Sequence, residues 1–118
     1  MPAFRHSLDP IFRPRSVAVV AVLNEGGTRK ILGVSRFYLT PETGEAEFAL
    51  VVGDSHQRQG LGRHLLTRLV EIAKERGVKK LVGQVLRENG PMLALTGSLG
   101  FSSPRAVEDD VVEVEKDC

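Results

Sequence analysis

Residues 45–77 constrain the fold of this chain more than any other stretch, because they join an apolar strand, a glycine-bearing loop and a long amphipathic helix. The run 48–52 (FALVV) is continuously apolar and is bounded by Gly53, which predicts a strand covered on both faces. Apolar residues then recur at helical spacing from Leu61, and Gly77 ends the pattern as a residue just past a helix does. The order of strand, loop and helix predicts one unit of an α/β fold.

The loop of this unit, 57–62 (QRQGLG), has the features of an anion site. Gly60 and Gly62 have no Cβ atom, so a ligand can approach the backbone closely. The first amides of the following helix have no intrahelical partner, and both these amides and the helix dipole favour an anion. The loop therefore predicts a phosphate cradle, with an ordinary tight helix entry as the alternative.

Composition bounds the class of protein. The chain has 118 residues and is 42% hydrophobic, which suits one domain with a real core. A net charge of +1 gives no bulk electrostatic case for nucleic-acid or membrane binding. The single cysteine, Cys118, excludes an internal disulfide or a thiolate cluster, and no set of residues has metal-ligand spacing. With no apolar run near ~20 residues and no signal peptide, we expect a cytoplasmic protein.

The rest of the chain predicts a mixed sheet. Residues 1–16 contain Pro2, Pro10 and Pro14 and are expected to form a partly ordered lead-in to a single domain at 17–118. Two Val-rich or Ile-rich segments precede the strand of the first unit and predict an antiparallel meander. After the long helix, a further strand is expected to pair in parallel with that strand through the crossover. The expected elements are strands at 17–23, 31–39, 80–86 and 111–114, a loop or short strand at 102–109, and a short helix from Asn89 to Gly100.

At this point the sequence resembles a known family. The loop 57–62 fits Q/R-x-x-G-x-G/A, the acetyl-CoA pyrophosphate motif of the GNAT superfamily of N-acetyltransferases. The segments 89–95 (NGPMLAL) and 99–101 (LGF) resemble the next helix and turn of that fold. Their sequence is most similar to the GNAT module of Pat-type protein lysine acetyltransferases. The resemblance implies an α/β (α+β) fold with a mostly antiparallel sheet and one parallel crossover pair.

One part of the family pattern is missing from the sequence. Members usually carry a strand and two helices ahead of the strand expected at 17–23, and those helices help to wall the acceptor site. Only sixteen proline-broken residues stand there. The resemblance therefore predicts that the N-terminal helices are absent. Their absence indicates a fragment, a truncated gene model, or a domain whose acceptor site is completed by a dimer partner or a fused domain.

The resemblance also implies which residues hold acetyl-CoA. Backbone amides of 59–63 (Gln59, Gly60, Leu61, Gly62 and Arg63) would bind the pyrophosphate, with the side chains of Gln57 and Arg58 nearby. Arg58 and Arg63 are otherwise solvated, but a cation is unfavourable at a helix start, so an anionic ligand explains them better. Asn89 would contact the pantetheine arm, or serve simply as a helix cap, or both.

Two further roles concern the reaction itself. Backbone amides of Leu50, Val51 and Val52, where the fold splays, would stabilise the oxyanion. Glu47 is the candidate general base, because it stands among hydrophobic residues just before the loop, where family members often keep a catalytic carboxylate. A base is needed because a lysine amine is about 99.9% protonated at pH 7. The alternative for Glu47 is a solvent-facing residue or a pair with Arg36 or Lys30.

The sequence departs from the family at Thr96, where many members place a tyrosine as general acid. Pat-type modules often lack this tyrosine, and water can protonate a thiolate. We therefore expect an acetyl-CoA-dependent N-acetyltransferase that transfers an acetyl group to an amine, such as a protein lysine, by direct attack in a ternary complex. The alternatives are a non-catalytic acyl-CoA-binding regulatory module and an acetyltransferase for a small-molecule amine.

Overall fold

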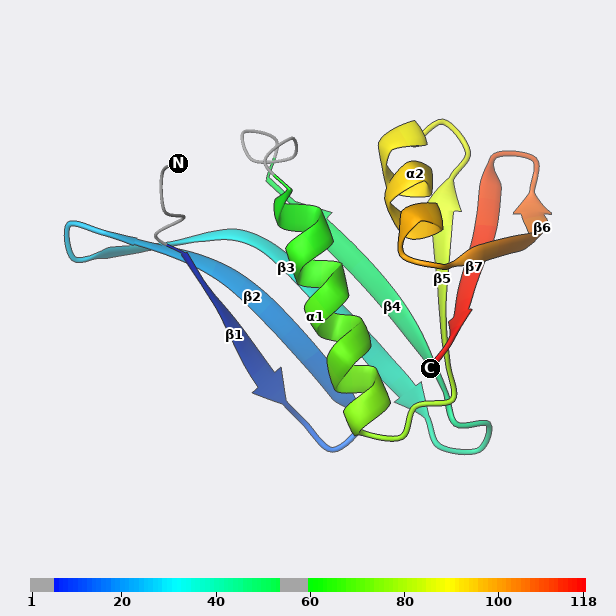
Figure 1. The fold of residues 1–118 in the computed structure, drawn as a ribbon, viewed down its shortest axis with the longest axis horizontal. Helices are drawn as coiled ribbons and strands as arrows, with labels where there is room; N and C mark the ends of the chain where they lie inside the picture. The colour runs from blue at the N-terminus through cyan, green and yellow to red at the C-terminus, as the bar shows by residue number, and fades with distance from the viewer. Residues whose placement is uncertain (1–5, 54–59) are drawn as a thin grey trace.

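The chain folds around one seven-stranded sheet (Figure 1). The structure is a computed structural model that describes residues 6–53 and 60–118. The strand order is β1-β2-β3-β4-β5-β7-β6, and all neighbours are antiparallel except the pair β4–β5. The elements are β1 (His6–Phe12), β2 (Ser16–Glu25), β3 (Thr28–Thr40), β4 (Glu45–Val52), α1 (Leu61–Glu75), β5 (Lys80–Leu86), α2 (Gly90–Ser98), β6 (Ser102–Glu108) and β7 (Val111–Asp117). This architecture confirms the expected mixed sheet with one parallel pair and, within 6–53 and 60–118, two helices.

The core lies between α1 and one face of the sheet, which we call the inner face. The buried side chains of α1 recur at helical spacing because a surface helix turns one apolar stripe toward the sheet. They meet inner-face residues of four strands, and the members of this core are Val17, Val19, Phe37, Ala46, Phe48, Leu65, Leu66, Leu69, Ile72 and Leu81. The opposite, outer face leaves Ile31 and Tyr38 exposed. One face of this sheet is therefore packed and the other is open.

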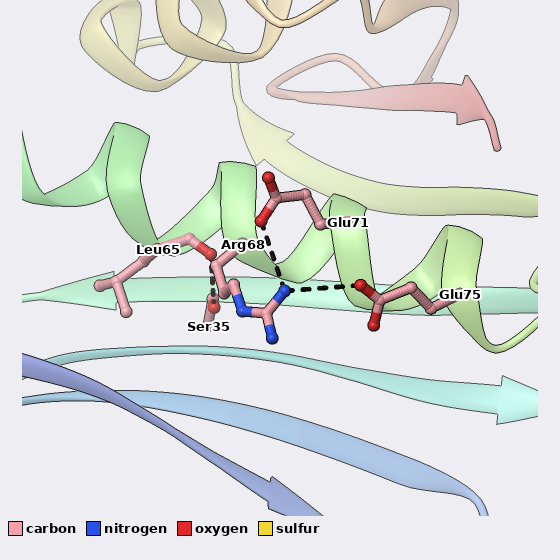
Figure 2. Close-up of polar contacts among 5 residues, drawn as sticks. All are labelled: Ser35, Leu65, Arg68, Glu71 and Glu75. Atoms are coloured by element: carbon pink, nitrogen blue, oxygen red, sulfur yellow. Dashed lines mark hydrogen bonds and ion pairs between the residues drawn. The ribbon is translucent and has the colours of Figure 1, made fainter.

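Polar contacts fasten α1 to the sheet and to itself (Figure 2). Ser35 of β3 is fully buried, and its hydroxyl donates a hydrogen bond of 2.9 Å to the Leu65 carbonyl oxygen. A buried hydroxyl without a partner would be costly, so this bond helps to define how the helix sits on β3. On the exposed side, Arg68 lies 3.4 Å from Glu71 and 3.7 Å from Glu75, a surface network that adds little stability.

The parallel pair β4–β5 is short and opens into a V. Its register comprises three pairs, from Glu45 with Lys80 to Glu47 with Val82, and beyond them the strands diverge. Figure 1 shows the two strands separating toward the end where α1 begins and where α2 lies. The V therefore has its apex at Glu47 and its open end at the start of α1.

The N-terminal segment differs from the expected lead-in. His6–Phe12 forms an antiparallel hairpin with β2 through a turn in which the Arg13 amide donates to the Ser16 carbonyl oxygen at 2.9 Å. Pro10 fits in this strand because β1 lies at the edge of the sheet, where a missing N–H costs no ladder bond. Residues 6–12 are therefore a strand of the sheet, where the sequence predicted a lead-in.

The expectation that 48–52 is covered on both faces is also wrong. Phe48 is buried on the inner face, but Ala49 and Val51 are exposed on the outer face, Val51 by 68%. An unbroken apolar run fits a strand covered on one side as well as a strand covered on both. The outer face of β4 is therefore accessible along its whole length.

Candidate functional site

The site begins where α1 starts, at a backbone turn that only glycine adopts easily. Gly60 is the N-cap, with φ of 76°, and a Cβ placed there would meet no atom within 4 Å. The glycine is therefore required by the left-handed backbone conformation and not by a lack of space. The first helical bond runs from the His64 amide to the Gly60 carbonyl oxygen, so the preceding amides have no intrahelical acceptor. Gln57, Arg58 and Gln59 lie outside the described residues.

Gly62 has a different physical reason. It is buried, and a Cβ there would lie 3.4 Å from a methyl of Leu95, 3.6 Å from a methyl of Leu50 and 3.7 Å from a methyl of Val52. Those three side chains belong to α2 and β4, so Gly62 stands where the helix start, the strand end and α2 meet. A larger residue here would fill the space between the three elements.

That space is a cleft of about 530 Å³ at the open end of the V. Its lining is mostly apolar with a few polar side chains, the usual composition of a small-molecule site. The lining residues are Leu50, Val52, Gly60, Gly62, Arg63, Asn89, Pro91, Met92, Ala94, Leu95 and Ser98. The side chain of Leu61, by contrast, is buried in the core, so this residue can contribute only its backbone to the site.

The strand β4 directs alternate amides into the V. The Gly53 amide donates to the Leu32 carbonyl oxygen at 2.9 Å, and the Val51 carbonyl oxygen lies beside Gly33 of β3. Because antiparallel pairing alternates, Val51 bonds toward β3, whereas the amides of Leu50 and Val52 point toward β5. The expected oxyanion donor set therefore narrows to the amides of Leu50 and Val52, and the structure turns the amide of Val51 the other way.

Asn89 sits at the start of α2 and lines the cleft. Its Oδ1 accepts a hydrogen bond of 3.2 Å from the Met92 amide, and Pro91 follows at the first turn. The cap role expected from the sequence is therefore present. Among residues 6–53 and 60–118 the side-chain amide nitrogen has no acceptor, so the cap does not exclude contact with a ligand.

Arg63 joins the two helices across the cleft. Its guanidinium donates to the Ser98 hydroxyl oxygen at 2.7 Å, and that hydroxyl donates to the Leu95 carbonyl oxygen at 2.8 Å. The cation thus lies at the last turn of α2, where the helix dipole favours positive charge. The sequence favoured an anionic ligand over a solvated side chain as the explanation of Arg63; the structure supplies a further cause in the contact with Ser98. Ser98 was missed, because a serine in a short helix carries no signal of a partner 35 residues away.

Glu47 lies on the other side of the sheet from this cleft. It is exposed at the apex of the V, opposite Tyr38 on β3 and Val82 on β5. It lines an outer cleft of about 330 Å³ together with Thr40, Thr43, Glu45, Ala46, Val82, Gly83, Gln84 and Glu113. The expected burial among hydrophobic residues is not found, and within 6–53 and 60–118 Glu47 forms no ion pair with Arg36 or Lys30.

Thr96 takes the place of the family tyrosine and is buried, with 1% exposure. Its hydroxyl donates to the Leu93 carbonyl oxygen at 3.1 Å, so it serves α2 and does not reach the V. Among the residues that the structure describes, no group of three or more His, Cys, Asp or Glu side chains is placed to hold a metal ion. None of the helices in that same part of the chain is long and apolar enough to cross a membrane.

A sheet that opens into a V beside an uncapped, glycine-bearing helix start is the architecture of an acyl-coenzyme A-dependent transferase. The cleft fits coenzyme A. The open helix start suits its diphosphate, the apolar walls suit its pantetheine arm, and the amides of β4 that point into the V suit the polar atoms of that arm. Comparison with known proteins agrees. The sequence model of the acetyltransferase (GNAT) family matches residues 2–101, and the chain belongs to this family, whose members use acetyl-CoA.

Individual relatives agree with this assignment. An acetyltransferase of Pseudomonas aeruginosa is 29% identical over 115 residues, which cover 98% of this chain and 62% of that protein. The [ribosomal protein bS18]-alanine N-acetyltransferase of Escherichia coli is 44% identical over 55 residues, 47% of this chain and 37% of that protein. The crystal structure of the GNAT domain of S. lividans PAT is 29% identical with a TM-score of 0.76, over 88% of this chain and 61% of that one. The chain thus spans about three fifths of the length of the first and third of these proteins.

Proposed function

We propose that this chain is an acetyl-CoA-dependent N-acetyltransferase in which the two clefts on opposite faces of β4 hold the two substrates. The observation that carries the proposal is the V between β4 and β5, with the inner cleft at its open end and Glu47 at its apex. The thioester would enter along the inner face and the amine along the outer face. This arrangement allows direct attack in a ternary complex without a covalent enzyme intermediate.

The start of α1 and the end of β4 would position the donor. The amides that precede His64 would hold the pyrophosphate, and the amide nitrogen of Asn89 would bind the pantetheine arm. The Leu50 amide, directed into the V, would stabilise the oxyanion that develops on the thioester carbonyl. In the reaction the amine nitrogen bonds to the carbonyl carbon, the carbon–sulfur bond breaks, and coenzyme A leaves as a thiolate that water protonates.

Glu47 would remove the proton from the attacking amine. A protonated amine has no lone pair for attack, and Glu47 is the carboxylate at the apex, one strand residue from the point where β4 and β5 part. Its exposure on the outer face leaves it accessible to an amine and to water. A water molecule between the amine and the carboxylate would satisfy the same chemistry.

We further propose a protein lysine as the acceptor and a Pat-type module as the closest functional class, acting in the cytoplasm. The open outer face supports a macromolecular acceptor, because both helices of the described residues lie on the inner face and leave the outer cleft accessible. A second copy or a fused domain would complete the acceptor wall. A small-molecule amine is the rival acceptor within the same chemistry.

A second candidate function is an acyl-CoA-binding regulatory module without catalysis. The observation that favours it is Thr96, which is buried and bonded within α2 where many members of the family have a tyrosine. Tight acetyl-CoA binding with no acyl transfer to any amine would support this candidate.

The decisive experiment combines binding and transfer. The purified chain is titrated with acetyl-CoA by calorimetry, then mixed with acetyl-CoA and a cell lysate so that acetylated sites are mapped by mass spectrometry. Glu47→Gln should slow turnover about 10²–10⁴-fold with an unchanged Kd for acetyl-CoA. Glu25→Gln, an exposed glutamate at the end of β2 that lines neither cleft, is the control and should leave turnover nearly unchanged. Equal turnover in Glu47→Gln and the parent protein across the pH range would remove Glu47 from the mechanism.

A further inference from the structure

A phenylalanine ring closes the apex of the V on its inner side. The last pair of β4 and β5 is Glu47 with Val82, so the next pair would be Phe48 with Gly83. In place of that pair, the ring of Phe48 lies against the bare backbone of Gly83. A Cβ built on Gly83 would stand 2.5 Å from Cε1 and 2.7 Å from Cζ of this ring, closer than packed atoms approach. The glycine therefore makes the seat for the ring.

A second ring supports the first. Phe101 lies with its ring centroid 5.1 Å from that of Phe48, at an interplanar angle of 52°, a favourable aromatic geometry. The position of Phe101 is fixed by α2, because its amide donates to the Thr96 carbonyl oxygen at 3.0 Å. Phe48 and Phe101 are only 5% and 6% exposed, so this part of the V is filled with side chains. We call Phe48, Gly83 and Phe101 the aromatic plug.

The plug lies where the acyl group would end. This step rests on the proposed function. If the phosphates of acetyl-CoA bind at the start of α1, they occupy the open end of the V. The thioester, at the other end of acetyl-CoA, then faces the apex. The Leu50 amide, which points into the V, is two strand residues or about 7 Å from Phe48. An acyl carbonyl at that amide leaves the acyl chain between Leu50 and the ring.

We propose that the aromatic plug limits the length of the acyl chain, with Phe48 as the specificity-determining residue. Close packing makes the plug resist compression, so each added methylene must displace a ring that is packed against Gly83 and Phe101. Discrimination of this kind is typically about 10–200-fold per methylene. The protein should therefore accept acetyl groups and reject butyryl groups.

The experiment measures the Kd of acetyl-CoA and of butyryl-CoA for the full chain by calorimetry, together with transfer rates from each donor. The parent protein should bind acetyl-CoA at least about tenfold more tightly than butyryl-CoA. Phe48→Leu should reduce this ratio to about threefold or less, chiefly by improved butyryl-CoA binding. Val19→Ala is the control: it removes buried methyl groups on β2, which β3 separates from the V, and it should leave the ratio unchanged.

Gly83→Ala tests the plug from the other side. Its new Cβ would push the Phe48 ring out of its seat, and acetyl-CoA binding should weaken severalfold while circular dichroism reports a folded chain. If the parent protein binds both donors equally, the inference is overturned even if every variant fails to fold, and the proposed function stands. If the parent protein binds neither donor, the proposed function fails and this inference fails with it.

Discussion

The two helices of this protein begin in opposite ways. At α2, the side chain of Asn89 accepts from the Met92 amide at 3.2 Å and Pro91 removes a donor from the first turn. At α1, the N-cap is Gly60, which has no side chain, and the first turn contains no acidic residue. Every helix start has amides without intrahelical partners. At α2 the Asn89 side chain satisfies one of these amides. At the start of α1, no side chain of residues 6–53 and 60–118 caps them, and we propose that a phosphate takes this place.

From this difference we propose that the start of α1 is functional and that the start of α2 is structural. A chain under selection for stability alone gains about 1 kcal/mol from a capping side chain. Gly60 forgoes this gain and adopts a left-handed conformation instead, and it lines the inner cleft. The cation that follows, Arg63, is held by the last turn of α2, so α1 keeps an open start without an unpartnered positive charge.

The largest expected effect comes from closing the open start. Gly60→Val places a β-branched residue at φ of 76°, which costs about 1–3 kcal/mol of backbone strain and reorients the first amides. Acetyl-CoA binding should fall at least about 100-fold, close to the limit of calorimetric detection. Gly97→Val in α2, where a Cβ meets no atom within 4 Å and φ is helical, is the control and should preserve affinity. Normal affinity in Gly60→Val would show that the two helix starts do not differ in function.

The second effect concerns Gly62, which is required by the space around it, whereas Gly60 is required by its backbone conformation. Gly62→Val would carry methyl groups toward Leu95 and Leu50 and fill the floor of the inner cleft. We expect acetyl-CoA affinity to fall about 10–100-fold, or about 1.4–2.7 kcal/mol, with a smaller loss for Gly62→Ala, whose Cβ fits at ordinary contact distances. Calorimetry measures the acetyl-CoA affinity of each protein, and a thermal melt measures its stability. Equal affinity in the parent, alanine and valine proteins would place the ligand elsewhere.

The third effect separates the two roles of Asn89. Asn89→Ala removes the cap and should lower the free energy of unfolding by about 1 kcal/mol, seen as a decrease of a few degrees in Tm. Asn89→Asp keeps a capping oxygen but loses the amide nitrogen. It should retain stability and weaken acetyl-CoA binding about threefold to tenfold, the loss of one hydrogen bond of about 1 kcal/mol. Parent-like affinity in Asn89→Asp would restrict this residue to the structural start.

The smallest effect concerns the contact between the helices. Ser98→Ala removes the acceptor of Arg63 at an exposed position and should change stability by less than about 0.5 kcal/mol. Arg63→Ala should weaken acetyl-CoA binding about threefold if its guanidinium faces a phosphate, and this loss should shrink as salt is raised. A loss independent of salt in a titration series would assign Arg63 to packing only.

Much of the fold could be predicted from the sequence. The strand expected at 80–86 has those bounds in the structure, because a short apolar run lies between the glycine that ends α1 and the Asn-Gly-Pro that starts α2. The helix expected from Leu61 has its first residue there. The strand β1 could not be predicted, because Pro10 is tolerated only at a sheet edge, and edge position depends on the order of strands.

The site was predicted less completely. Local patterns indicated Gly60, Gly62 and Asn89, since each stands at an element boundary that the sequence marks. Glu47 followed from its apolar flanks and from the family resemblance. The local patterns did not indicate that Glu47 and the inner cleft lie on opposite faces of β4, nor that Phe48 rests on Gly83. These relations join residues from separate segments, and no local pattern records a distance between segments.

Short-range chemistry in the sequence thus determined the helix starts, the strand periodicity and the family. The tertiary structure alone decided that β4 and β5 part after three pairs, that the cleft forms at their open end and that one face of the sheet stays bare. The physical reason is that backbone conformation depends on neighbours along the chain, whereas a cleft is the space left when distant segments pack. The residues that line such a space come from separate segments of the sequence, so no single segment predicts it.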